Sequence, residues 1–341
     1  MHIPDGYLGP HTYIAYYGVM GPLWLWASKA LKKTVKAKHA SYLALGAAFS
    51  FVIMMFNLPV PGGSTGHAVG GALVAIVLGP WAALMAVSIA LVIQALLFGD
   101  GGITTIAANC FNMAFIMPFS AYYIYRVVSS GSEITSTRPV FAAAVAGYLS
   151  LNLAALFTAV AFGIQPMIAH KPDGTPLYAP YPLGVAVPIM AFEHLILFGF
   201  IEAVVTGLVV AYIMRSEPSL LGFTGVYPEP SAARKGIANI KGLWVGLGVL
   251  IIFTPIGLIV SGTAWGEWST EEIGALLGYV PEGLKGLNSI WPSLLPDYSI
   301  PGLKGSPLLE AGGYIISAFI GVLVVTAAAF VISRFLPAEG K

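Results

Sequence analysis

The sequence predicts an all-α integral membrane protein, and three features of its composition support that prediction. Of its 341 residues, 57% are hydrophobic and only 9% are charged, against about 25% charged in an ordinary soluble domain. The mean hydropathy is +0.83, and apolar stretches near the ~20 residues that cross a bilayer as a helix recur along the chain. The 40 Gly and 24 Pro suit broken membrane helices and structured loops. The chain is therefore expected to lie among membrane lipid.

Breakers between the apolar runs divide the chain into nine candidate helices. The third is short and ends at Gly79 and Pro80, so we expect a partial span whose ends are shielded by protein or water. The nine ranges are 12–31, 40–58, 67–79, 81–98, 105–125, 139–164, 185–214, 242–262 and 312–333.

The distribution of basic residues predicts which side of the cytoplasmic membrane the N-terminus occupies. If it is extracytoplasmic, only Lys171, Lys285 and Lys304 of the 16 Lys and Arg residues lie on the outer side. The positive-inside rule strongly favours that multi-pass topology over its inverse. The first six residues lack the basic and apolar regions of a signal peptide, so they are expected to remain on the mature protein.

A connector divides the predicted helices into two groups. Residues 216–241 carry several charges and Pro or Gly residues, which is typical of a linker. The prediction is a seven-helix domain over residues 1–215 and a two-helix domain over residues 242–341. The last two helices enclose an extracytoplasmic loop, 263–311, that is too long for a simple turn. The net charge of +1 indicates no nucleic-acid partner.

The first two residues carry the atoms of a metal chelate. The α-amine of Met1 and the backbone nitrogen and imidazole of His2 can close two fused rings around one ion, which leaves one coordination site open. Loss of the amide proton needs an ion that prefers a square plane of nitrogens, which favours Ni²⁺ and Cu²⁺, with Co²⁺ also suitable. Pro4 and Gly6 take the second and fourth places of a predicted β-turn that folds the tail back. The lone Cys110 excludes a cysteine metal cluster.

A glycine-rich loop on the outer side supplies the candidate for the fourth ligand. His67 follows residues 61–66 (PGGSTG). Ser64 or Thr65 is expected to cap the third helix, with His67 in its first turn, where the helix dipole favours the neutral imidazole. The alternatives are an unstructured tail for His2 and a hydrogen-bonded interfacial role for His67.

Four segments together resemble the CbiM/NikM family, whose members are substrate-capture components of energy-coupling-factor importers for cobalt and nickel. They are residues 1–8 (MHIPDGYL), 63–67 (GSTGH), 100–103 (DGGI) and 109–113 (NCFNM), and the resemblance spans roughly residues 1–215. It implies that the Met1 amine, the His2 amide nitrogen and imidazole, and the His67 imidazole form a square-planar metal site.

The C-terminal domain resembles the small partner subunit of these importers, of NikN/CbiN or PDGLE type, fused to the capture component. The matching residues are 281–285 (PEGLK), a departure from Pro-Asp-Gly-Leu-Glu, and 295–303 (LPDYSIPGL). Such a fusion resembles nickel-type arrangements, although cobalt, which cobalamin biosynthesis uses, remains open. The resemblance implies a transmembrane coupling subunit and a separate ATPase as partners, nickel or cobalt as cargo, and no organic cofactor.

Three ionisable residues lie within the seventh predicted span. Glu193, His194 and Glu202 are candidates for conduction or coupling, because an ionisable residue at membrane depth is by default a functional hypothesis. His194 and Glu202 share a helix face. A buried hydrogen-bonded network that packs the helix is the alternative, and we favour it because the metal site is predicted at the outer surface.

Other polar and small residues receive supporting roles. Asp5, Ser64, Thr65, Asn109 and Asn112 are candidates for holding the binding loop through hydrogen bonds.

A stripe of small residues, Ala40, Ala44 and Ala48, lines one face of the second span and allows another helix to approach closely. In the importers that the chain resembles, such a stripe looks like the face that meets the coupling subunit. Packing within the same chain is the alternative.

The sequence contains no Gly-x-x-x-x-Gly-Lys-[Ser/Thr] motif, so the chain is expected to be a non-catalytic component whose ATP-driven work is done by separate subunits. One rival is an ion-coupled secondary transporter with Glu193, His194 and Glu202 as a proton relay. A second rival, an intramembrane metalloenzyme, is weaker because no His-Glu-x-x-His motif occurs.

Overall fold

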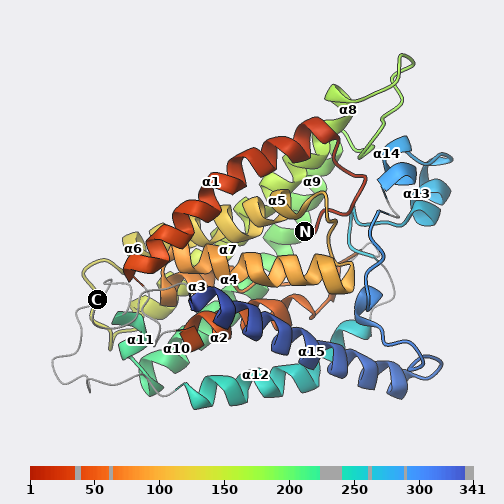
Figure 1. Ribbon diagram of the computed structural model, residues 1–341. Helices are drawn as coiled ribbons and strands as arrows, with labels where there is room; N and C mark the ends of the chain where they lie inside the picture. The colour runs from red at the N-terminus through yellow and green to blue at the C-terminus, as the bar shows by residue number, and fades with distance from the viewer. Residues whose placement is uncertain (35–39, 61–63, 223–239, 260–262, 288–289, 335–341) are drawn as a thin grey trace.

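The computed structural model describes residues 1–34, 40–60, 64–222, 240–259, 263–287 and 290–334, and they are mostly helical (Figure 1). Most of the predicted connector 216–241, and residues 61–63 of the predicted binding loop, lie outside the described residues.

Helices make up most of residues 1–222. Three of them widen from α-helical to π-helical winding part-way, at Gln94, Cys110 and His194, and such turns are frequent at functional sites. The segments are α1 Pro10–Thr34, α2 Ala40–Met54, α3 Gly71–Leu78, α4 Pro80–Ile93, η2 Gln94–Phe98, α5 Ile106–Asn109, η3 Cys110–Ile116, α6 Met117–Ser129, α7 Arg138–Gly163, α8 Gln165–Ile168, α9 Leu183–Glu193, η4 His194–Phe198, α10 Gly199–Ser216 and α11 Ser219–Gly222.

The C-terminal residues form two long helices joined by short ones. The start of α13 is fixed by a capping box, in which the Ser269 hydroxyl and the Glu272 carboxylate each accept the other's backbone N–H. The segments are α12 Lys241–Phe253, η5 Thr254–Leu258, α13 Thr270–Leu277, α14 Glu282–Leu287, η6 Pro296–Tyr298 and α15 Pro307–Ser333. In Figure 1, α13 and α14 lie at the same end of the molecule as the N-terminus.

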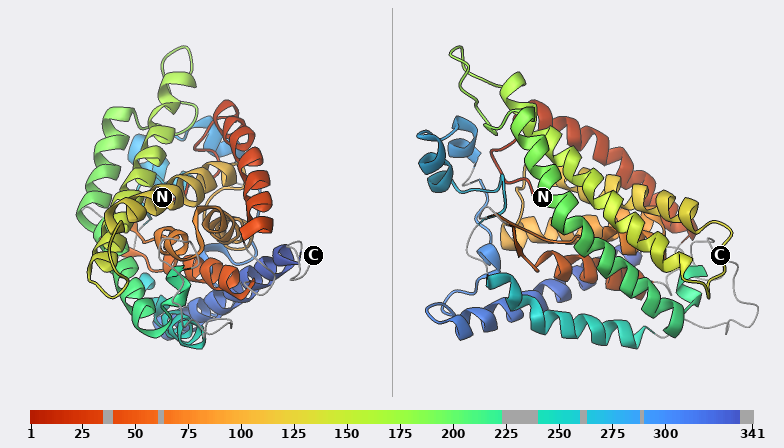
Figure 2. Two further views of the ribbon diagram at one scale, coloured as in Figure 1. Left: turned by 90° about the vertical axis from the view of Figure 1, so that its left-hand side faces the viewer. Right: turned by 180° about the vertical axis from the view of Figure 1, so that it is seen from behind.

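The long helices pack side by side in a bundle (Figure 2). Helix α7 contacts α6, α9 and α10, whereas α2 contacts α4 and also α12 and α15 of the C-terminal segment. Ala44 and Ala48 on α2 are completely buried and Ala40 is 7% exposed. The small-residue face that was predicted to meet a partner subunit is therefore covered within the chain, as in the alternative that the sequence left open.

The segment before α3 differs from the prediction. Residues 58–66 form a two-stranded antiparallel hairpin, β1 Leu58–Val60 and β2 Ser64–Gly66, with Leu58 opposite Gly66. Helix α3 begins at Gly71, after the left-handed Gly70 and without a side-chain cap. The capping role predicted for Ser64 and Thr65 is therefore wrong, because the β-branched and extended residues of this segment pair as strands.

Five of the described helices are long and apolar enough to cross a membrane. Large apolar side chains remain exposed on the bundle surface, such as Leu208 on α10, Ile252 on α12 and Phe319 on α15, as lipid contact requires. The predicted class, a helical multi-pass membrane protein, is confirmed. The five helices are Pro80–Phe98, Arg138–Ile168, Leu183–Ser216, Lys241–Leu258 and Pro307–Ser333.

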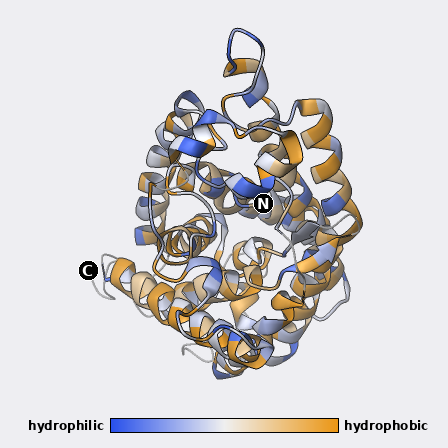
Figure 3. Ribbon diagram, turned by 90° about the vertical axis from the view of Figure 1, so that its right-hand side faces the viewer, coloured by the Kyte–Doolittle hydropathy of each residue, from blue (hydrophilic) through white to orange (hydrophobic). Residues whose placement is uncertain are grey.

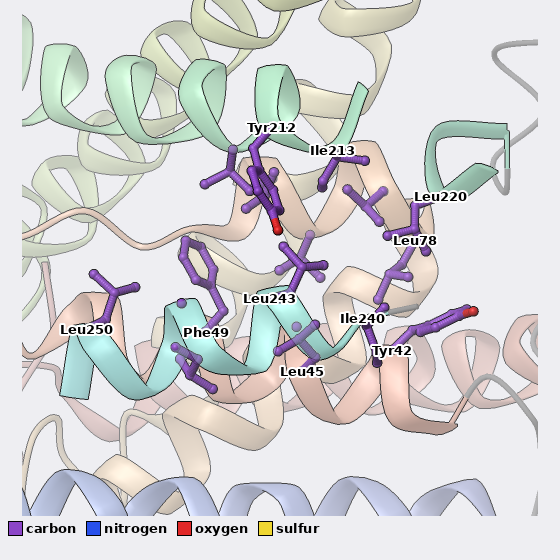
Figure 4. A pocket seen from close by; sticks show the side chains of 18 of the residues that line it. Tyr42, Leu45, Phe49, Leu78, Tyr212, Ile213, Leu220, Ile240, Leu243 and Leu250 are labelled. Carbon is purple, nitrogen blue, oxygen red and sulfur yellow. The ribbon is translucent and has the colours of Figure 1, made fainter. Parts of the chain in front are cut away.

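An apolar cavity of about 510 Å³ lies between α2, α3, α10, α11 and α12 (Figure 4). Its lining includes Tyr42 near the start of α2, Ile213 near the end of α10 and Leu243 near the start of α12. Among the described residues that line it, only the two tyrosines carry a polar side-chain atom. These residues include no group of the kind that binds a transition metal.

Candidate metal centre

The first nine residues run into the molecule before α1 begins, and their side chains are mostly buried. Met1 is 7% exposed, His2 1% and Ile3 0%. Asn109 at the end of α5 holds this tail in two ways: its Oδ1 accepts the Ile3 N–H at 2.8 Å, and its Nδ2 donates to the Ile3 carbonyl at 3.2 Å. The same carbonyl accepts the Gly102 N–H at 2.9 Å. Asn109 thus holds the N-terminal tail, whereas the sequence suggested that it holds the binding loop before His67.

Asp5 fixes the next part of the tail to the loop before α5. Its carboxylate accepts the backbone N–H groups of Ile103 at 3.0 Å and Thr104 at 2.8 Å. The turn that follows is centred on Asp5 and Gly6, and Gly6 adopts φ +84°. The predicted turn, with Pro4 and Gly6 in its second and fourth places, is therefore shifted by one residue, because Gly6 takes the left-handed place that glycine adopts without strain.

His67 lies between β2 and α3 and is 6% exposed. Its Nδ1 is 3.0 Å from the Ala68 carbonyl oxygen, so Nδ1 carries the proton and Nε2 presents a lone pair. The loop after it is fixed by Glu202, whose carboxylate accepts the N–H groups of Val69 at 2.9 Å and Gly70 at 3.0 Å. Glu202 therefore stabilises the histidine loop and the start of α3.

The imidazoles of His2 and His67 lie next to each other. His2 Nδ1 lies 3.3 Å from His67 Nε2 and 3.1 Å from Asp100 Oδ1. Both neighbours are acceptors, so His2 Nδ1 carries a proton in this arrangement and His2 Nε2 does not. Among the residues that the structure describes, His2 Nε2 is buried without a hydrogen-bond partner, and so is Gln94 Oε1. The Gln94 side chain is one of the neighbours that influence the pKa of His2.

Burial keeps both histidines uncharged. Desolvation, assisted by the positive N-terminus, lowers the pKa of His2 from 6.5 to about 4. The same two causes hold the pKa of His67 well below 6.5. Burial also raises the pKa of Asp100 above its ordinary value. At pH 7 both imidazoles are therefore neutral, the form in which histidine binds a metal.

The C-terminal domain reaches this site from the opposite side. The Met1 amine forms an ion pair with Glu267 at 3.0 Å. Tyr298 donates its hydroxyl to Asp100 Oδ2 at 2.5 Å and accepts the Gln94 Nε2–H at 2.8 Å. These contacts escaped the sequence interpretation. The only signal for them was the Glu- and Pro-rich composition of loop 263–311.

The donor set fits a square-planar ion. Metal–nitrogen bonds of about 2 Å place neighbouring corners of a square about 2.8 Å apart, close to the 3.3 Å between His2 Nδ1 and His67 Nε2. No group of three His, Cys, Asp or Glu side chains that could hold a metal occurs in the part of the chain that the structure describes. A site here needs backbone nitrogens, and those of Met1 and His2 are adjacent.

The remaining predicted residues are positioned as follows. Ser64 accepts the Trp265 N–H at 2.9 Å, so it links the hairpin to the C-terminal domain. Asn112 donates to Thr158 at 3.0 Å and therefore packs η3 on α7, away from the N-terminal tail. His194 Nδ1 is 2.8 Å from the carbonyl of Met190 in its own helix.

Thr65 and Glu193 are buried near the same region. Thr65 is 5% exposed and Glu193 is 6% exposed. Glu193 lies at the end of α9.

A polar chamber of about 580 Å³ adjoins the site and is lined by both domains, including His67, Asp100, Glu267 and Tyr298. Figure 3 shows hydrophilic segments gathered around the N-terminus at this end of the bundle. The chamber gives an ion a polar approach to the imidazoles.

Comparison with known proteins covers nearly the whole chain. Residues 2–220 match the family described as the CbiM cobalt uptake substrate-specific transmembrane region, and residues 241–338 match the PDGLE domain. The chain is 45% identical to the fused nickel transport protein NikMN of Rhodobacter capsulatus, over 96% of this chain and 95% of that protein. It is 41% identical to the probable fused nickel transport protein LarMN of Lactiplantibacillus plantarum, over 95% of each.

Solved structures show the same relationship for the larger domain. A crystal structure of a transition metal transporter is 48% identical and superimposes with a TM-score of 0.60, covering 67% of this chain and 98% of that one. A truncated transition metal transporter is 50% identical, with a TM-score of 0.59 over 63% of this chain and 98% of that one.

Proposed function

Because this chain belongs to the CbiM family of nickel and cobalt transport proteins and carries a fused PDGLE domain, we propose that it captures a nickel or cobalt ion with its own N-terminus for import. The resemblance inferred from the sequence motifs is confirmed by these matches. The observation that carries the proposal is the 3.3 Å approach of His2 Nδ1 to His67 Nε2 beside the buried Met1 amine.

The proposed site is a square plane of four nitrogens, with Met1 as the mature N-terminus. The Met1 amine, the His2 amide nitrogen and His2 Nδ1 occupy three consecutive corners, because they close a five-membered and a six-membered chelate ring. His67 Nε2 occupies the fourth corner. The hydrogen bond from His67 Nδ1 to Ala68 supports this role, because a ligating histidine usually donates its other ring N–H to a fixed acceptor.

Binding at this site rearranges protons at named atoms. The amine and the amide each lose one proton to become ligands. The proton on His2 Nδ1 moves to Nε2, which frees Nδ1 for the ion. The proton on His2 Nε2 can then be donated to Gln94 Oε1. The two buried atoms that lack partners would thus form a hydrogen bond with each other. The contact between His2 Nδ1 and Asp100 is given up in exchange.

The preference for a square of nitrogens supports nickel as the first cargo, with cobalt second. The relatives named as fused nickel transport proteins support the same order. Copper binds such nitrogens more tightly, so selectivity against it requires control of the metal supply.

The proposed setting is an energy-coupling-factor importer in the cytoplasmic membrane, with the N-terminus and metal site extracytoplasmic. A transmembrane coupling subunit and a separate ATPase do the ATP-driven work, since the sequence has no P-loop motif. The domains are a capture domain 1–215, a cytoplasmic connector 216–241 and a two-helix domain 242–341. The separate matches to residues 2–220 and 241–338 support that division.

Metal content of the purified full-length protein tests the proposal. A C-terminal tag leaves Met1 free, and intact-mass measurement checks that it is retained. The affinity for nickel should fall at least about 100-fold in His2→Ala and in His67→Ala, because each substitution removes an imidazole ligand. His170→Ala, on an exposed loop, should match the unsubstituted protein. Full nickel content in both the His2→Ala and the His67→Ala variants would refute the site.

A further inference from the structure

We propose that Glu267 is a positioning residue of the metal site, through which the C-terminal domain orients the Met1 amine toward the captured ion. This inference rests on the proposed function. Glu267, in the C-terminal domain, would fix the orientation of the Met1 amine, which is a metal ligand of the N-terminal domain.

The contact is short and shielded from water. Glu267 Oε1 lies 3.0 Å from the Met1 nitrogen, and the exposed fractions of the two side chains are 19% and 1%. A buried ammonium group needs a charged or strongly accepting partner. Two other acidic groups near the tail have other partners: Asp5 binds the N–H groups of Ile103 and Thr104, and Asp100 contacts His2 and Tyr298. A third, Glu193, is buried nearby, but in the part of the chain that the structure describes the ion pair of the amine is with Glu267. Glu267 is therefore the residue that holds the amine.

The chemistry of an amine ligand allows this contact to persist after metal capture. An amine that binds a metal through its lone pair keeps two N–H bonds, and one of them can still donate to Glu267. Binding of a cation makes that N–H a stronger donor. Outer partners of this kind fix the orientation of a ligand, and their removal typically costs about 10- to 100-fold in metal affinity.

The His2 end of the chelate behaves differently. Nδ1 has one position for a proton or a metal, so an ion must displace the contact with Asp100. Glu267 and Asp100 therefore have opposite relationships to the cargo. The first contact is retained on binding and the second is exchanged.

The backbone around Glu267 is fixed to the N-terminal tail and the hairpin. The Tyr7 hydroxyl donates to the Trp268 carbonyl at 2.7 Å, and the Trp265 N–H donates to Ser64 at 2.9 Å. The carboxylate therefore lies between two anchors that connect the domains.

The PDGLE-like segment packs on the same tail at Gly6. A Cβ added there would lie 2.7 Å from the Gly283 carbonyl oxygen and 2.7 Å from the Leu284 Cα. Gly6 thus allows the close approach of the C-terminal domain, and its positive φ is suited to glycine alone. The tail is enclosed between the loop before α5 and the C-terminal domain.

An opposing account would give Glu267 the role of a competitor. If the carboxylate only neutralised the ammonium in the metal-free protein, the ion would have to break that pair, and loss of Glu267 would strengthen nickel binding. The two accounts therefore predict changes of opposite sign.

The experiment measures the Kd for Ni²⁺ of full-length, C-terminally tagged protein by competition with a chelator of known affinity. Glu267→Ala should weaken binding by about 10- to 100-fold. Glu267→Gln keeps an acceptor oxygen in a side chain of the same shape, so its nickel affinity should fall by less than about tenfold. The matched control is Glu271→Ala, because Glu271 is exposed and lies four residues further along the chain. Its nickel affinity should equal that of the unsubstituted protein. The nickel d–d absorption band should shift in the Glu267→Ala variant and be restored in Glu267→Gln, which a merely structural role would not produce.

Unchanged or tighter nickel binding in Glu267→Ala would overturn the inference, as would an equal loss in Glu271→Ala. The His67→Ala variant separates this failure from failure of the proposed site. If His67→Ala loses nickel while Glu267→Ala does not, only the role of Glu267 is wrong. If His67→Ala keeps nickel, the site itself is wrong.

Discussion

Two cavities of similar size lie at opposite ends of the helix bundle, and their linings differ completely. The cavity of about 510 Å³ is lined by aliphatic and aromatic side chains of α2, α3, α10, α11 and α12 (Figure 4). The chamber of about 580 Å³ is lined by His67, Asp100, Glu267 and Tyr298. Most of its lining residues come from loops and short helical turns, with Tyr314 of α15 as an example from a long helix. Cavity volume therefore does not identify the cargo, whereas nitrogen and carboxylate groups on fixed loops define where a cation can be held.

A single methyl group added at each cavity tests this comparison. Gly102→Ala should lower nickel affinity at least about 100-fold, because the new Cβ would overlap the Asp5 backbone nitrogen, and displacing the tail misplaces both backbone ligands. Competition titration of purified protein measures the change. Affinity within twofold of the unsubstituted protein would show that the tail is not held where the structure places it.

Removal of the buried Gln94 amide tests the proposed proton shift on His2. Gln94→Met should lower nickel affinity by about 10- to 100-fold, because the His2 Nε2–H of the loaded site would lose its acceptor. The control is Asn152→Leu on α7, which likewise removes an amide with a buried, unpartnered oxygen. Gln94 donates to Asp100 and Tyr298 beside the metal site, whereas Asn152 donates to the Tyr148 carbonyl within α7. Equal affinity in both variants would contradict the proposed proton shift.

The smallest effect is expected in the apolar cavity. Gly246 lines that cavity, and a Cβ added there meets nothing within 4 Å. Gly246→Ala should leave nickel affinity unchanged and stabilise α12 by about 0.5–1 kcal/mol, because alanine loses less backbone entropy than glycine in a helix. Thermal unfolding and nickel titration check the two parts. A loss of nickel binding would link the two cavities, against our account.

The N-terminal part of the site was accessible from sequence because its atoms are covalent neighbours. The amine of Met1 and the amide and imidazole of His2 form their chelate rings whatever the rest of the fold does. His67 was weaker from local sequence alone and depended on the family resemblance. Asn109 could be proposed as a loop holder because a polar residue inside a span requires a partner.

The other half of the site could not be predicted from local sequence. Glu267 reaches Met1 and Tyr298 reaches Asp100, each across more than 190 residues of chain, and such contacts depend on how the two domains pack. The shift to π-helical winding that contains Gln94 has no propensity signal. The hairpin before α3 was missed because two three-residue strands are too short for a periodic pattern.

A direct test of the N-terminal site adds three glycines before Met1 while keeping every native side chain. Three are used because a single added residue would make His2 the third residue of the chain, where the amine, two amides and the imidazole can hold nickel without His67. The extension converts the amine into a peptide nitrogen and moves His2 out of chelate register, so two backbone ligands are lost together. Metal content measured by mass spectrometry after purification through a C-terminal tag should fall from about one nickel per chain to near background, with folding checked by unchanged gel filtration. If the extended protein holds about one nickel ion as tightly as the native start, the N-terminal site is contradicted.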